Sequence, residues 1–148
     1  MMKFLATKAA RRVALLCGLL GGGSVEAMVT DIDNAELEKL MSTGVPLVDI
    51  RTAAEWQQTG IIPGSHLLTF FDAQGRANPA VWLQQAGAIA KPGEPLILVC
   101  RTGNRTKMLG QFLSEQAGYT KVYNVRSGIV AWAREGRKVV PAAPNLAN

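Results

Sequence analysis

Short apolar runs alternate with segments of helical periodicity along most of the chain. The runs with the length and composition of strands are residues 45–50, 66–70, 96–99 and 121–125. The helix-like segments are residues 30–43, 52–58, 108–116 and 128–135, and Asn78-Pro79 has the form of a further helix start. Because strands alternate with helices, the pattern predicts an α/β fold whose mainly parallel sheet is covered by helices on both faces.

Two of these segments carry more specific expectations. The first helix is expected over residues 30–43, with Asp31 and Asp33 as candidate amino-terminal caps and Gly44 as its end. Residues 96–99 are apolar at every position, which is typical of a central strand buried on both faces.

The first 27 residues differ in composition from the rest of the chain. Residues 1–12 contain four basic and no acidic side chains, residues 13–20 are apolar, and Ala27 ends a small-residue pattern that suits a signal peptidase. We therefore expect residues 1–27 to be a signal peptide, residues 28–140 to form one domain and residues 141–148 to be a loose tail. The protein would then be exported, to the periplasm in a bacterium. Two variants stay open, a twin-arginine signal at Arg11-Arg12 and a lipid on Cys17.

Charge and cysteine content narrow the function classes. The apolar run is shorter than the roughly 20 residues of a membrane-spanning helix, so no stable membrane anchor is expected. Without residues 1–27, 12 of the 16 basic and 10 of the 11 acidic side chains remain, and the net charge falls from +5 to +2. This balance argues against nucleic acid as a partner. Cys100 is then the sole cysteine, so no internal disulfide explains it. A monomer is the default expectation.

Cys100 is the strongest candidate for chemistry. It follows the apolar run 96–99 and precedes a polar loop that leads into a helical segment. In α/β sheets, ligands bind at this junction, beside the carboxyl ends of strands and the amino ends of helices. Free backbone N–H groups and the helix dipole there stabilise a thiolate. Cys100 is therefore interpreted as a nucleophile, and the alternative is a buried apolar cysteine at a strand end.

The loop Cys-Arg-Thr-Gly-Asn-Arg at residues 100–105 resembles the active-site loop of the rhodanese family of sulfurtransferases. Residues 48–65, with Val-Asp-Ile-Arg, Glu-Trp and Gly-Ile-Ile-Pro-Gly-Ser, and residues 127–132, Ser-Gly-Ile-Val-Ala-Trp, resemble two further signatures of that family in the same order. Ile61 stands where the family usually has histidine, and Ser127 where it has glycine. The resemblance covers about residues 30–136 and implies a rhodanese-like domain with a central, mainly parallel five-stranded sheet and helices on both faces.

The resemblance implies that Cys100 carries sulfur as a persulfide. Backbone N–H groups of residues 101–105 would stabilise the sulfur anion without an organic cofactor or a metal. Arg101 and Arg105 are candidate ligands of a dianionic donor such as thiosulfate, because their guanidinium groups suit its oxygens. The residues between them, which are expected to shape the loop and support binding, are Thr102, Gly103 and Asn104.

Asp49 ends a predicted strand at the same sheet edge, and we consider it as a supporting residue that orients a loop arginine or as a simple turn cap. Arg51 and Glu55 are expected to pair with neighbours for structural reasons. His66 is the only histidine, and a single histidine does not make a metal site.

The predicted function is thiosulfate sulfurtransferase, an enzyme that moves a sulfane sulfur from thiosulfate or a related donor to cyanide, a small thiol or a protein thiol. A phosphatase on this fold needs five residues between the loop cysteine and arginine, whereas four separate Cys100 from Arg105. A thiol-disulfide oxidoreductase would show a Cys-x-x-Cys pair, which is absent from the sequence. The remaining alternative is a non-catalytic or redox-sensing binding module on the rhodanese fold.

Overall fold

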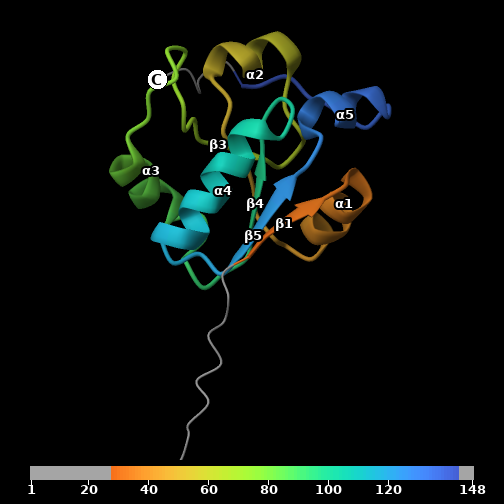
Figure 1. Ribbon diagram of the computed structural model, residues 1–148. Coiled ribbons are helices and arrows are strands. Elements are labelled where there is room, and N and C mark those ends of the chain that lie inside the picture. Colours follow the sequence, from red (N-terminus) through yellow and green to blue (C-terminus); the bar gives the residue numbers. More distant parts are fainter. Residues whose placement is uncertain (1–27, 144–148) are drawn as a thin grey trace, which may run out of the picture.

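A computed structural model describes residues 28–143 of the protein, and its centre is one five-stranded sheet (Figure 1). The strands lie in the order β1-β5-β4-β2-β3, and every neighbouring pair is parallel. In chain order the elements are β1 (Met28–Ile32), α1 (Asn34–Ser42), β2 (Leu47–Asp49), α2 (Ala53–Thr59), β3 (His66–Leu67), α3 (Pro79–Ala86), β4 (Leu96–Val99), α4 (Asn104–Gln116), β5 (Lys121–Val125) and α5 (Gly128–Arg134). The predicted α/β fold is confirmed.

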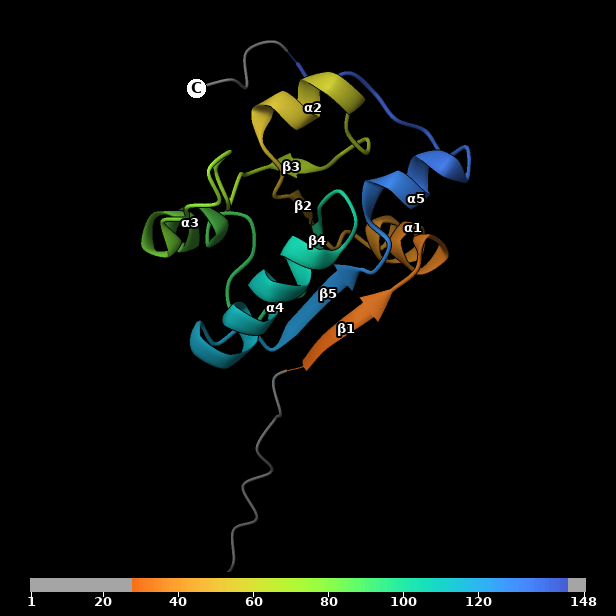
Figure 2. The ribbon, with the colours of Figure 1, turned by 45° about the horizontal axis from the view of Figure 1, so that its top comes forward.

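The two faces of the sheet carry separate cores. Successive side chains of a strand point to opposite faces, so Leu96 and Leu98 of β4 pack toward α3 and α4, whereas Ile97 and Val99 pack toward α1 and α5. All four side chains are fully buried, as expected for a central strand. Figure 2 shows α2 beyond the arrowheads of the strands, at the carboxyl edge of the sheet. Cys100, which directly follows β4, and Asp49, the last residue of β2, lie at the same edge.

The expectation for residues 30–43 was wrong at its start. Residues 28–32 form the edge strand β1, which pairs in register with β5 from Met28 opposite Lys121 to Ile32 opposite Val125. The helix begins only at Asn34, where Asp33 accepts a hydrogen bond from the Glu36 N–H at 2.9 Å. Local helix signals at residues 30–32 are thus overridden by pairing with a strand that lies far away in the sequence.

The remaining predicted elements are present with adjusted ends. β3 is limited to His66–Leu67, although the Phe70 N–H still donates to the Ile50 carbonyl at 3.2 Å. Asn78 caps α3 and Pro79 is in its first turn, as the sequence predicts. Gly118 lies just after α4, whose last residue is Gln116.

The boundaries proposed at the two ends of the chain stay predictions. The expected signal peptide, residues 1–27, lies outside the described residues, as does most of the expected tail. Val140 forms an antiparallel bridge with Ile61, and Ala142 is buried beyond it. Within residues 28–143 no helix has the length and apolar character needed to cross a bilayer.

Candidate functional site

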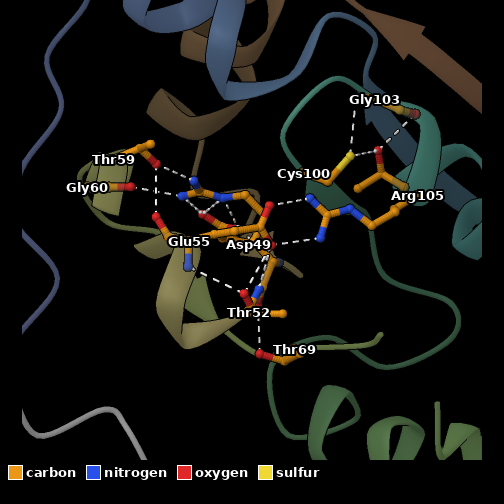
Figure 3. Close-up of polar contacts among 11 residues, drawn as sticks. Asp49, Thr52, Glu55, Thr59, Gly60, Thr69, Cys100, Gly103 and Arg105 are labelled. Carbon is orange, nitrogen blue, oxygen red and sulfur yellow. Dashed lines mark hydrogen bonds and ion pairs between the residues drawn. The ribbon is translucent and has the colours of Figure 1, made fainter. Parts of the chain in front are cut away.

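Cys100 lies directly after β4 and continues the alternation of that strand. Its side chain belongs to the core on the α3 and α4 face, and only 1% of the residue is exposed. The Gly103 N–H donates a hydrogen bond to Cys100 Sγ at 3.2 Å (Figure 3). A backbone donor aimed at the sulfur stabilises negative charge on it, as a nucleophile needs.

The loop after Cys100 is held from behind by α5. The Ile129 N–H donates to the Cys100 carbonyl at 2.9 Å, and the Val130 N–H donates to the Arg101 carbonyl at 3.2 Å. Because peptide groups are planar and trans, the N–H groups that follow these carbonyls, those of Arg101 and Thr102, point away from α5. The first turn of α5 therefore orients the loop amides.

Glycine is required at two places where the loops touch. Gly103 has φ +94°, and a Cβ there would lie 2.1 Å from the Arg126 carbonyl oxygen. Gly128 has φ +62°, and a Cβ there would lie 2.2 Å from the Arg101 carbonyl oxygen. Ser127, which replaces a family glycine, has an ordinary φ of −107°. The departure at Ser127 thus imposes no backbone strain.

Arg105 is tied to α2. Its two terminal nitrogens donate to the Glu55 carboxylate at 2.8 and 2.6 Å, a bidentate pair. The Arg105 guanidinium lowers the pKa of Glu55 from 4.5 to about 2. Glu55 also accepts the Thr52 N–H at 3.0 Å and so closes the capping box of α2. One carboxylate thus joins the cap of α2 to the loop that follows Cys100.

Asp49 does not hydrogen-bond to either loop arginine. Its carboxylate is fully buried and accepts from Arg51, with the shortest contact 2.6 Å from the Arg51 terminal nitrogen. Arg51 donates further to the Thr59 hydroxyl at 2.7 Å and to the Gly60 carbonyl at 2.8 Å. The pair therefore joins the end of β2 to the end of α2, and the role of Asp49 seen here is structural.

Arg101, Thr102 and Asn104 are exposed. Arg101 borders a pocket of about 500 Å³ between α2 and α5, and among residues 28–143 it forms none of the ion pairs. The pocket is lined by Arg51, Glu55, Gln58, Thr59, Arg101, Ile129, Val130 and Ala133. Of the two loop arginines, Arg101 is thus the one whose charge is free.

Thr106 and Asn124 belong to the site, although the sequence did not single them out. Thr106 Oγ1 lies 3.4 Å from Cys100 Sγ and 2.6 Å from Asn124 Oδ1. The only available signal was the position of Thr106, one residue past the loop on the first turn of a helix. Asn124 lies in β5, and the sequence does not reveal that β5 pairs with β4, the strand that precedes Cys100.

No group of three or more His, Cys, Asp or Glu side chains is placed to hold a metal ion within the described part of the chain. His66 is exposed in β3.

Comparison with known proteins gives one consistent result. The rhodanese-like domain model matches residues 33–135. A sulfurtransferase of Allochromatium vinosum is 37% identical over 115 residues, which cover 76% of this chain and 96% of that protein. The thiosulfate sulfurtransferase GlpE of Actinobacillus pleuropneumoniae is 39% identical over 105 residues, 71% of this chain and 86% of that protein.

A solved structure agrees with these relatives. The rhodanese-related protein of Thermoplasma volcanium is 26% identical, has a TM-score of 0.57, and the match covers 76% of this chain and 99% of that one. The matched family region extends from the cap of α1 through the Cys100 loop to the end of α5. With the sheet, the loop and its sulfurtransferase relatives in agreement, the chain belongs to the family of rhodanese-like domains.

Proposed function

We propose that this protein is a thiosulfate sulfurtransferase that carries sulfur as a persulfide on Cys100. The observation that supports it most directly is the Gly103 N–H at 3.2 Å from Cys100 Sγ, in a loop fixed by α5. The positive charge of Arg105, which interacts electrostatically with Cys100 although its hydrogen bonds go to Glu55, adds to the stabilisation of a sulfur anion.

The proposed cycle has two transfers. Cys100 thiolate attacks the outer sulfur of thiosulfate, a new S–S bond forms on the protein, and sulfite leaves with the electron pair of the broken S–S bond. The acceptor then attacks the outer sulfur of the persulfide, and Cys100 leaves as thiolate. Cyanide becomes thiocyanate in this step, whereas a thiolate acceptor becomes a persulfide. No redox cofactor is needed, because each step exchanges one bond to sulfur for another.

The free charge of Arg101 supports a role for this residue in binding the sulfur donor. Thiosulfate is a dianion, and Arg101 is the exposed, unpaired guanidinium of the described loop. The pocket beside it has apolar walls from α5 and polar walls from α2, so it offers room for an acceptor larger than cyanide. We propose that a thiol acceptor, small or on another protein, approaches from this side to a monomeric enzyme.

The test is the intact mass of the reduced protein after thiosulfate and again after cyanide. We expect a gain of one sulfur atom that cyanide removes. Cys100→Ser should show no gain, and Cys17→Ser, which removes the other cysteine of the chain, should gain sulfur normally. Folded, reduced protein that takes up no sulfur would refute the proposal, and uptake by Cys100→Ser would refute the role of Cys100.

We also propose that the protein is exported after cleavage behind Ala27. This position is supported by the composition of residues 1–27, where basic residues precede an apolar run and Ala27 ends a small-residue pattern. Amino-terminal sequencing of protein recovered from the periplasmic fraction of a bacterial host should begin at Met28. Full-length protein found only in the cytosolic fraction would contradict it.

A further inference from the structure

A buried chain of polar side chains runs from Cys100 to the edge of the sheet. Thr106 is fully buried, and its hydroxyl oxygen lies 3.4 Å from Cys100 Sγ, 3.1 Å from the Gly103 carbonyl and 2.6 Å from Asn124 Oδ1. A hydroxyl has a single proton to donate. Only one of these three neighbours can receive that proton at a time.

The geometry favours Asn124 as the receiver. Asn124 is 2% exposed, and its Nδ2 donates to the Asp31 carboxylate at 2.8 Å. A carboxylate only accepts, so this contact fixes the amide with Oδ1 toward Thr106. The distance of 2.6 Å is the shortest of the three, so the Thr106 proton points to Asn124.

This orientation leaves a lone pair of Thr106 facing the sulfur. A lone pair suits the S–H of a thiol, which can donate to it, but it does not stabilise a thiolate. To donate to a thiolate, the Thr106 hydroxyl must rotate away from Asn124 and leave the buried Oδ1 without its donor, which is unfavourable. Asn124 and the thiolate therefore compete for one proton.

We propose that Asn124, held by Asp31, is a positioning residue that directs the Thr106 hydroxyl away from the sulfur and so favours the thiol form of resting Cys100. Loss of the thiol proton favours rotation of the Thr106 hydroxyl toward the sulfur. The inference rests on the proposed function only in taking Cys100 as the reacting group.

Other charges act on Cys100 and stay constant in the test. Arg105 of α4 interacts with Cys100, with Glu55 of α2 and with Asp49 of β2. Glu55 forms its ion pair with Arg105 itself, whereas Asp49 forms its ion pair with Arg51. Arg101 follows Cys100 in the chain. Asp31 of β1 reaches Cys100 only through Asn124 and Thr106, so its charge needs a separate control.

The experiment measures the rate of alkylation of Cys100 by iodoacetamide against pH, with peptide mass spectrometry to follow this cysteine separately from Cys17. Asn124→Leu should move the half-maximal rate lower by about one pH unit, because the freed hydroxyl can donate to the thiolate. The plateau rate at high pH should fall by no more than about threefold, because a thiolate of lower pKa is a slightly weaker nucleophile. In the Thr106→Val background, Asn124→Leu should cause no shift.

If Asn124→Leu does not fold, substitutions at the exposed Asp31 provide the test instead. Asp31→Ala removes the anchor of the Asn124 amide and should also move the profile to lower pH. Asp31→Asn loses the same charge but keeps an acceptor, and it should move the profile much less.

Three results would overturn the inference. They are an unchanged or raised half-maximal pH in Asn124→Leu, the same shift when Thr106 is valine, or equal shifts in Asp31→Ala and Asp31→Asn. Because alkylation needs no sulfur donor, these results are independent of whether the protein transfers sulfur.

Discussion

Three arginines surround Cys100 in sequence or space, and their side chains differ in freedom. Arg51 is 1% exposed and bound to Asp49, and Arg105 is held by Glu55 at two points. Arg101 is exposed and borders the pocket. At the scale of the residue, the charge that can meet an incoming anion without breaking an existing pair is that of Arg101.

Replacing Arg101 with alanine should therefore weaken the binding of thiosulfate. A charge-assisted hydrogen bond contributes about 1.5 kcal/mol or more, so the apparent KM for thiosulfate should rise about tenfold, with a smaller change in kcat. Steady-state kinetics with cyanide as acceptor measure both constants. Lys121→Ala is the charge-matched control, because Lys121 lies at the amino end of β5 on the opposite edge of the sheet. An unchanged KM in Arg101→Ala would remove its proposed role.

At the same scale, the sequence identifies Cys100 and its loop, because a strand followed by a glycine-containing polar loop is a local pattern. It does not identify the partners of the loop. Glu55 lies 50 positions from Arg105, and Asn124 lies 18 positions from Thr106. Asp49 was expected to be able to orient a loop arginine, but its actual partner is two residues away. Such pairings depend on how the elements pack, which a single sequence does not reveal.

At the scale of the element, two ion pairs hold α2 in place. Arg51 joins the end of β2 to Thr59 and Gly60 at the end of α2, whereas Glu55 joins the start of α2 to α4. The Arg51–Asp49 pair is wholly buried, whereas the Arg105–Glu55 pair is partly exposed. Breaking the two pairs is therefore expected to lower the free energy of unfolding by different amounts.

The substitution Arg51→Leu should strongly destabilise the fold. It leaves the Asp49 carboxylate buried without its partner, which costs about 3–5 kcal/mol of unfolding free energy. Urea unfolding followed by circular dichroism gives this value. Arg76→Ala breaks the exposed pair with Asp72 and should change the free energy of unfolding far less. Similar effects of both substitutions would show that the buried pair is not structural.

The Glu55–Arg105 pair predicts that the free energy of unfolding depends on pH. Because the pKa of Glu55 is lowered from 4.5 to about 2, its ionised form stabilises the folded state above pH 4.5, and this contribution is lost as the pH falls toward 2. Glu55→Gln keeps an acceptor for the capping box but removes the charge. The substitution should lower the free energy of unfolding by about 1 kcal/mol at pH 7. The difference from the original protein should disappear near pH 2. A difference that persists unchanged at low pH would contradict this account.

The elements themselves were predictable wherever a local pattern decided them. The apolar run of β4, the Asn78-Pro79 start of α3 and the glycine after α4 all act over a few residues. β1 was not predictable in this way, because residues 30–32 carry helix-cap side chains and become a strand only by pairing with β5. The resemblance implied five strands, and the local pattern alone indicated four.

At the scale of the whole molecule, the sheet separates two cores that share its strands. Trp82 lies in the core beneath α3 and α4, and Trp132 lies in the core beneath α1 and α5. The side chains of β4 alternate between the two cores, so neither core can be lost while β4 stays in place.

Unfolding should therefore be a single transition on both faces. Two variants that retain only Trp82 or only Trp132, with the other tryptophans changed to phenylalanine, report each core by fluorescence. In each variant the fluorescence and the far-ultraviolet circular dichroism should have the same urea midpoint. A core that unfolds before the circular dichroism signal changes would show that the two faces are independent.

The pairing of β1 with β5 has a consequence for synthesis on the ribosome. β1 is the first described element to emerge, and its partner is the last strand; Asp31 and Asn124, which join them, are 93 positions apart. A nascent chain that has not yet released β5 offers β1 no partner in the sheet. The edge of the sheet, and with it the link from Asp31 to Cys100, is therefore completed only when translation of the domain is almost over.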